Sequence, residues 1–203
     1  MKIGIMGGTF NPIHNGHLML GEYSYRSYRL DQVWFMPNGN PPHKAGISTS
    51  YSADIRARMT ELAIQDVPYF RLEDYEVKRQ EPSYSYQTLE HFKEVYPEDS
   101  FYFIIGADSL FNINKWMKPE RILKVCTILA AFRGDKDNSE IMNRQIELLK
   151  EQYGADTDIR LLSSPLMKVS SHELREMVSE GKSISGLVPE TVEQYIKENG
   201  LYR

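Results

Sequence analysis

Short apolar runs alternate along the chain with longer stretches in which hydrophobic residues recur every three or four positions. The first pattern is typical of buried strands, and the second of helices with one buried face. The apolar runs predict strands over residues 2–6, 32–36, 69–77, 101–105, 127–132 and 159–162. The periodic stretches predict helices over residues 15–28, 52–65, 85–96 (starting at Ser85 or Gln87), 119–124, 139–153, 171–180 and 189–199, with a helical segment after Asp108.

This alternation predicts an α/β fold: a Rossmann-like, doubly wound and mostly parallel sheet with helices on both faces. We expect one domain over residues 1–203, with a small helical part at about 165–203. Ligands of such sheets bind beyond the carboxyl ends of the strands, where the strand order reverses. Three polar segments follow predicted strands, namely residues 7–17, 37–44 and 106–108.

Single residues refine this picture. We expect Ser52 to cap the helix that follows it, and four residues of the 139–153 helix to face the core: Ile141, Ile146, Leu148 and Leu149. Cys126 lies in an apolar run, so we predict a buried small residue rather than a nucleophile.

Charge and composition exclude several classes of protein. The chain has 203 residues and a formal net charge of −4, with 24 Lys and Arg against 28 Asp and Glu, so it has no basic footprint for nucleic acid. No apolar stretch approaches the roughly 18 residues that a membrane span requires. A single cysteine excludes a disulfide within the chain and suits a cytoplasmic location.

The segment after the first predicted strand carries the clearest chemistry. Gly7 and Gly8 let a ligand approach the backbone, and N–H groups at the following helix start can bind oxyanions. His14 and His17, three residues apart at that helix start, can face one ligand and stabilise charge on phosphate oxygens.

Each of these histidines alone would usually be a structural residue. A zinc pair is the other alternative. Zinc needs three or four ligands, and the remaining histidines, His43, His91 and His172, form no matching cluster in the sequence, so we predict no protein-held metal site.

Residues 7–17, GGTFNPIHNGH, resemble the GGxFDPxHxGH signature of the nucleotidylyltransferase superfamily. Within that superfamily, the chain most resembles the bacterial nicotinate-nucleotide adenylyltransferase family. Asn11 stands where the family often has Asp, which removes a negative charge near the phosphates.

Four further segments resemble motifs of that family in the same order. Residues 37–44 are similar to PxxxPPHK, 83–89 to SYTxxTL, 105–116 to IGxDxLxxxxxW, and 170–175 to SSTxIR with His172 replacing a hydroxyl residue. Taken singly, these segments also fit a surface loop, helix caps and a core tryptophan. Five motifs in order are much more specific, and the resemblance extends from about residue 2 to 202.

The resemblance implies transfer of AMP from ATP to nicotinate mononucleotide, giving nicotinate adenine dinucleotide and pyrophosphate by direct in-line attack, with Mg²⁺ accompanying ATP. It assigns catalysis to His14, His17, Lys44 and Arg175. It assigns ATP binding to Gly7, Gly8, Thr9, Phe10, Gly106, Ser170 and Ser171. It assigns mononucleotide binding to Asn38, His43, Ser85, Tyr86, Asp108, Trp116 and Arg133.

Several alternatives stay open from the sequence. The acceptor could be nicotinamide mononucleotide or phosphopantetheine, or the fold could serve as a non-catalytic nucleotide sensor. A relative of class I aminoacyl-tRNA synthetases is disfavoured because the chain is short, acidic and lacks a tRNA-binding extension. Whether the protein forms a homo-oligomer is not encoded in any motif.

Overall fold

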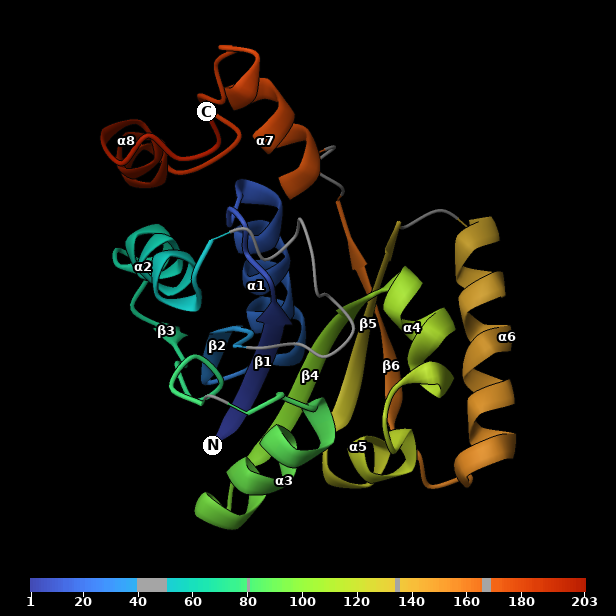
Figure 1. The fold of residues 1–203 in the computed structure, drawn as a ribbon. Coiled ribbons are helices and arrows are strands. Elements are labelled where there is room, and N and C mark those ends of the chain that lie inside the picture. Colours follow the sequence, from blue (N-terminus) through green and yellow to red (C-terminus); the bar gives the residue numbers. More distant parts are fainter. Residues whose placement is uncertain (40–50, 80, 134–135, 166–168) are drawn as a thin grey trace.

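The computed structural model describes residues 1–39, 51–79, 81–133, 136–165 and 169–203 (Figure 1). Within these residues the strands form one parallel sheet in the order β3-β2-β1-β4-β5-β6. The strands are β1 (Lys2–Gly8), β2 (Gln32–Pro37), β3 (Phe70–Leu72), β4 (Ser100–Gly106), β5 (Thr127–Arg133) and β6 (Ile159–Ser164). The predicted doubly wound α/β fold is confirmed.

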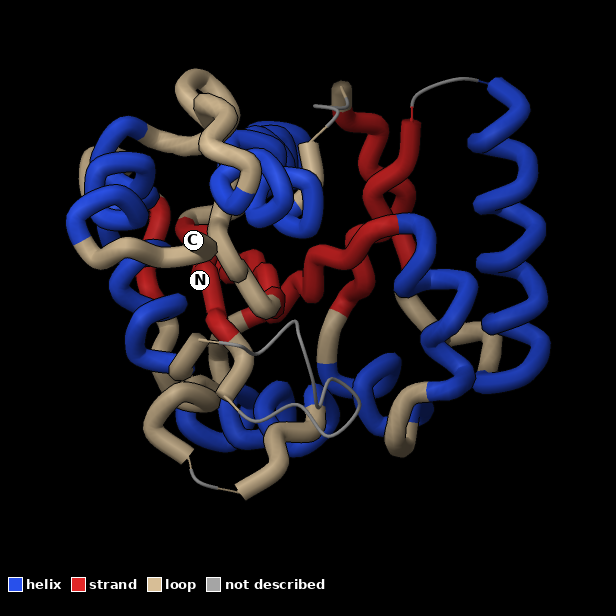
Figure 2. Tube along the Cα trace, turned by 45° about the horizontal axis from the view of Figure 1, so that its top comes forward, coloured by secondary structure: helices blue, strands red, loops and turns tan. Residues whose placement is uncertain are grey.

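Helices cover both faces of the sheet, and Figure 2 shows the strands between them. The helices are α1 (Asn15–Tyr28), α2 (Ala53–Ile64), α3 (Ser85–Val95), α4 (Ala107–Asn112), the 3₁₀ turn η2 (Ile113–Lys115), α5 (Pro119–Val125), α6 (Lys136–Tyr153), α7 (Ser171–Ser179) and α8 (Glu190–Glu198). None of the helices in the described part of the chain combines the length and apolar character needed to cross a membrane.

Two hydrophobic clusters lie on opposite faces of the sheet. Successive residues of a strand point to opposite faces, so Ile3 and Ile5 of β1 join one cluster while Met6 joins the other. The first cluster takes side chains from α3, α4, α5 and α6. The second takes them from α2, α7 and α8, so the C-terminal helices pack in one hydrophobic cluster with residues of the sheet.

The strand order reverses beside β1, which pairs with β2 on one side and β4 on the other. The segments that follow these neighbouring strands lie on opposite faces of the sheet, and ligands of such sheets bind at the carboxyl ends of the two strands. In Figure 1, α7 and α8 lie together at the top of the molecule, near the start of α1. The C-terminal helices therefore border the edge where a ligand is expected.

Three local predictions need correction. The strand expected over 69–77 ends at Leu72, and residues 75–78 form a turn that buries the Glu76 side chain against Thr88. Ile141 and Leu148 are exposed, because the buried face of α6 carries Met142 together with Ile146 and Leu149. Gly7 and Gly8 belong to β1 itself, since β2 pairs alongside them through Met36 and Pro37.

Other local predictions are confirmed. Ser52 caps α2, its side chain accepting the Ile55 N–H at 3.4 Å. Ile146 and Leu149 are buried, as is Cys126, and burial raises the pKa of the Cys126 thiol to about 12. A thiol that stays protonated at neutral pH is a poor nucleophile, which agrees with a packing role.

Candidate active site

The β1–α1 loop, residues 9–14, joins the carboxyl end of β1 to the helix that carries both motif histidines. His14 is the N-cap of α1, and its backbone N–H donates to His17 Nδ1 at 3.2 Å. The two imidazole rings stack with centroids 3.6 Å apart. Because Nδ1 of His17 accepts a hydrogen bond, a neutral His17 carries its proton on Nε2 and can donate it to a ligand.

Burial keeps this histidine pair neutral. His14 is 7% exposed, and burial lowers its pKa from 6.5 to about 4. Burial also lowers the pKa of His17 well below 6.5, with a further contribution from the neighbouring His14. Among the described residues, His14 Nδ1 has no hydrogen-bond partner. An anionic ligand beside the rings would favour their charged forms and raise both pKa values.

Packing fixes the position of the rings. The Phe10 ring meets the His17 ring edge to face, with centroids 5.0 Å apart. A Cβ on Gly8 would lie 2.7 Å from the Phe10 ring, and a Cβ on Gly16 would lie 3.0 Å from His14 Nδ1. Phe10 itself has a φ of 48°, a backbone conformation that costs free energy for a bulky residue. The two glycines thus make room for the rings.

Helix α7 binds the β1–α1 loop from the far end of the chain. Arg175 Nη1 donates to the backbone oxygen of Asn11 at 2.8 Å and to that of Ser171 at 3.1 Å. The Ser171 hydroxyl donates to the Pro12 oxygen at 2.8 Å. Ser170 caps α7 through Glu173. The structure therefore brings Ser171 and Arg175 to the same loop as His14, while the Ser170 hydroxyl has a local partner.

The chain terminus adds another contact to this loop. The Tyr202 hydroxyl donates to Asn11 Oδ1 at 2.6 Å, and both residues are buried. Burial raises the pKa of Tyr202, so its hydroxyl stays protonated and able to donate. The residue that departs from the family motif thus has a defined partner, 191 positions away in the sequence.

The predicted mononucleotide residues lie at the ends of neighbouring elements. Ser85 is the first residue of α3, where N–H groups have no partner within the helix. Asp108 lies exposed in the first turn of α4, two residues after Gly106. A Cβ added to Gly106 would have no described residue within 4 Å apart from its chain neighbours. The partly buried Trp116 ring packs edge-on against Phe103, with centroids 6.1 Å apart.

The remaining residues predicted to bind the mononucleotide, and Lys44, differ in what the structure describes of them. The Tyr86 ring is buried, with the Arg121 guanidinium 4.6 Å from its centroid. Arg133 is the last residue of β5. His43 and Lys44 lie outside the described residues. Asn38 follows β2 and donates its backbone N–H to the Gly8 oxygen at 2.9 Å, so it borders the β1–α1 loop.

Two buried charged residues were not identified from the sequence. Arg56 on α2 is 1% exposed and donates to the Thr9 oxygen, while Glu76 accepts from the Thr88 hydroxyl. The sequence contains one signal for Arg56: it shares the buried stripe of α2 with Met59, Thr60 and Ile64 at helical spacing. An arginine on such a stripe requires polar partners inside the protein.

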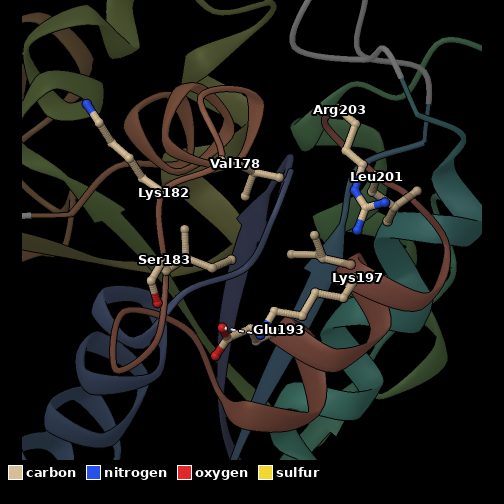
Figure 3. A pocket seen from close by; sticks show the side chains of 10 residues that line it. Val178, Lys182, Ser183, Glu193, Lys197, Leu201 and Arg203 are labelled. Carbon is tan, nitrogen blue, oxygen red and sulfur yellow. Dashed lines mark ion pairs between the residues drawn. The ribbon is translucent and has the colours of Figure 1, made fainter.

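A hollow of ≈ 310 Å³ lies between α7 and α8, away from the histidines (Figure 3). It is lined by residues that include Lys182, Glu193, Lys197 and Arg203, and α8 supplies a Glu193–Lys197 ion pair at 2.8 Å. None of its lining residues belongs to the motifs. The candidate site is therefore the carboxyl end of β1 and not this hollow.

Comparison with known proteins identifies the family of the chain. The family model described as cytidylyltransferase-like matches residues 5–177. A protein of Lachnoclostridium phytofermentans called "Probable nicotinate-nucleotide adenylyltransferase" is 44% identical over 201 residues, covering 99% of this chain and 98% of that protein. A Caldicellulosiruptor bescii protein of the same name is 41% identical over 203 residues, covering 100% of both chains.

A solved structure extends the comparison to the fold. Plasmodium falciparum nicotinic acid mononucleotide adenylyltransferase complexed with NaAD superposes with a TM-score of 0.79 at 21% identity, covering 99% of this chain and 97% of that one. The likeness spans the sheet and the C-terminal helices. Full-length identity above 40%, the matched family model and the shared fold together establish that the chain belongs to the nicotinate-nucleotide adenylyltransferase family of cytidylyltransferase-like proteins.

Proposed function

We propose that the protein transfers AMP from ATP to nicotinate mononucleotide, forming nicotinate adenine dinucleotide and pyrophosphate. The observation that carries this proposal is the stacked, neutral pair of His14 and His17 at the carboxyl end of β1, beside the reversal of strand order. The names of the two relatives that match along the whole chain support the choice of substrates.

The reaction is a direct displacement at phosphorus. A phosphate oxygen of the mononucleotide attacks the α-phosphorus of ATP, the new P–O bond forms, and the bond to the β-phosphate oxygen breaks in line with it. The electron pair leaves with pyrophosphate, so no covalent enzyme intermediate is needed. The protein contributes positioning and charge stabilisation, which supply most of the catalysis in phosphoryl transfers.

The histidine pair is suited to the charge that develops during transfer. His17 Nε2–H is a fixed donor because its Nδ1 is already engaged by the His14 N–H. The start of α1 adds backbone N–H groups and the positive end of the helix dipole. Arg175, held against the Asn11 carbonyl, brings a guanidinium to the same loop. We assign Lys44 the same charge-offsetting role on the resemblance alone.

The nucleotide and its acceptor take opposite sides of this loop in our proposal. ATP contacts the backbone of Gly7, Gly8, Thr9 and Phe10, with Gly106, Ser170 and Ser171. The pyridine nucleotide contacts Asn38, His43, Ser85, Tyr86, Asp108, Trp116 and Arg133. The N–H groups that begin α3 suit the nicotinate carboxylate, because a helix N-terminus stabilises negative charge.

Mg²⁺ fits this scheme as an ion that arrives with ATP. Within the described part of the chain, no three His, Cys, Asp or Glu side chains group to hold a metal. Mg²⁺ bound with nucleotides takes most of its ligands from phosphate oxygens and water, so it needs no protein cage. When bound, the ion would offset the charge of the triphosphate. The cytoplasmic location and homo-oligomer considered from the sequence stay predictions.

Pyrophosphate release tests the proposal. The protein is incubated with ATP and Mg²⁺, with nicotinate mononucleotide, nicotinamide mononucleotide or phosphopantetheine supplied in parallel. We expect the fastest release with nicotinate mononucleotide and its loss in His17→Ala. Faster release with nicotinamide mononucleotide would overturn the acceptor assignment only. Nucleotide binding without release for any acceptor would overturn the enzyme assignment and favour a sensor.

A further inference from the structure

Arg56 is a buried cation that makes no ion pair with any carboxylate among the described residues. Burial lowers the pKa of its guanidinium, although arginine remains charged at neutral pH. An apolar residue of similar size would fill the same space without the cost of desolvating a charge. The position therefore calls for an explanation beyond packing, and the hydrogen bonds of the guanidinium supply one.

The guanidinium joins two loops that leave adjacent strands. Nη1 donates to the Thr9 oxygen at 2.7 Å and to Asn38 Oδ1 at 3.1 Å. Nη2 donates to the Asn38 oxygen at 2.6 Å and to the Gly39 oxygen at 3.3 Å. Thr9 follows β1, on the proposed ATP side, and Asn38 follows β2, on the proposed mononucleotide side. One rigid, planar group thus fixes the separation of the two loops.

Glu76 holds the same segment from the opposite side. Its carboxylate accepts the backbone N–H of Gly39 and, at 2.8 Å, the hydroxyl of Thr88. Gly39 is pressed so closely against this turn that a Cβ would lie 2.0 Å from the Glu76 backbone oxygen. Thr88 lies in α3, three residues after Ser85. Gly39 is therefore bound by a buried cation at its oxygen and a buried carboxylate at its nitrogen.

These bonds form one buried chain of contacts, running from Thr9 through Arg56, Gly39 and Glu76 to Thr88. It connects three of the segments that the proposed function assigns to the two substrates: the β1–α1 loop, the β2 exit and the start of α3. None of the linking groups needs to touch a substrate. A ligand that orders one segment restrains the others through this chain, which is how two sites acquire a coupling free energy.

We propose that Arg56, with Glu76, is a positioning residue that couples the ATP site to the mononucleotide site. This inference rests on the proposed function for the identity of the two ligands. It requires that each substrate tightens the binding of the other in the native protein. It also requires that the coupling depends on the forked guanidinium, and not merely on a positive charge or on the stability of α2.

Calorimetry with a non-hydrolysable ATP analogue tests this coupling. Nicotinate mononucleotide is titrated into the full-length protein with and without the saturating analogue. We expect the analogue to tighten mononucleotide binding by about 5-fold or more in the native protein, the lower end of typical couplings. In Arg56→Lys, whose single ammonium cannot bridge both loops, the factor should fall to about 1, with kcat/KM for both substrates reduced together.

Ile64→Ala is the matched control, because it weakens α2 at the end remote from the loops. It should lower Tm while keeping the coupling factor.

Thr88→Val is the second variant: it should raise KM for the mononucleotide about 5-fold or less, since one hydrogen bond is lost, with little change for ATP. The inference is overturned if the native protein shows no coupling, if Arg56→Lys keeps it, or if Ile64→Ala loses it equally. The titration measures binding without catalysis. A protein that shows the coupling but forms no product from ATP and nicotinate mononucleotide would therefore count against the proposed function alone.

Discussion

The β1–α1 loop is buried and bound by distant segments of the chain, whereas the proposed mononucleotide side ends in exposed groups. Asn11 is 1% exposed and is held by both Arg175 and Tyr202. On the proposed mononucleotide side, Asp108 is exposed in the first turn of α4. The groups that we propose to handle phosphate charge are thus held in place by the protein itself, which is the condition for effective charge stabilisation.

This contrast separates two properties of the site. Groups that act on the phosphates are fixed by the protein itself, so their substitutions should affect the rate of transfer. Groups on the exposed side should instead affect which acceptor binds and how tightly. The buried contacts of Arg56 and Glu76 link the two sides without touching either substrate.

The largest expected effect is on the histidine pair. His17→Ala should lower kcat about 10²–10³-fold, the usual cost of losing one preorganised donor to developing charge. The measurement is the steady-state rate of pyrophosphate release. His172→Ala is the control, because His172 is exposed on α7 and contacts Glu176 only at the surface. The role is supported if His17→Ala is much slower than the native protein while His172→Ala keeps the native rate. Equal rates in the two variants would contradict it.

Acid should destabilise the β1–α1 loop through the same residues. The pKa of His14 is about 4 in the folded protein and near 6.5 unfolded, so the unfolded state binds more protons between these values. The free energy of unfolding should therefore fall as pH drops from 6.5 toward 4, by at most about 1.4 kcal/mol per pH unit for each histidine. Urea unfolding across this range measures the slope.

His14→Asn should reduce that slope, because it removes one titrating group. Burial raises the pKa of Glu76, which contributes in the opposite direction and makes the net slope smaller. An unchanged slope in His14→Asn would mean that other groups cause the acid sensitivity.

A pair of glycine substitutions compares a crowded position beside the histidines with an exposed position after β4. Gly16→Ala places a methyl group 3.0 Å from His14 Nδ1 and 3.1 Å from Val169, so the ring must move. We expect kcat to fall about 10-fold, since small displacements of catalytic groups are costly. Gly106→Ala places a methyl group with no described residue within 4 Å apart from its chain neighbours, so kcat and Tm should hold while KM for ATP rises if ATP approaches there. Similar kinetics for both variants would contradict the distinction.

The smallest expected effect concerns the tail of the chain. Tyr202→Phe removes the hydrogen bond to Asn11 Oδ1 and should lower the free energy of unfolding by about 1 kcal/mol, the net contribution of one such bond. Thermal unfolding measures the change. Tyr23→Phe, on the exposed surface of α1, should leave Tm as it is. A Tyr202→Phe protein as stable as that control would show that the bond contributes nothing.

Sequence patterns alone predicted the number of strands and where each begins along the chain, because buried parallel strands are near-continuous apolar runs that polar turns interrupt. They also identified the first-loop histidines and the later motifs, whose spacing is local. Cys126 was assigned to the core for the same reason. Each of these features depends on residues that are close together along the chain.

Tertiary structure decided what depends on distant partners. Sequence periodicity placed Ile141 and Leu148 of α6 in the core. Packing of α6 against β5 and β6 buries Met142 and leaves Ile141 and Leu148 exposed. The strand expected to reach residue 77 ends early, because Glu76 turns inward to bind Thr88 and Gly39.

The same limit applies to the candidate site. Nothing local in the sequence joins Asn11 to Tyr202, or Arg56 to both loops, since these bonds exist only once β1, β2, α2 and the tail have converged. A chain carries its strand pattern and motif spacing in neighbouring residues. Its buried polar contacts form between segments far apart in sequence, so folding alone determines which charges are buried and what they hold.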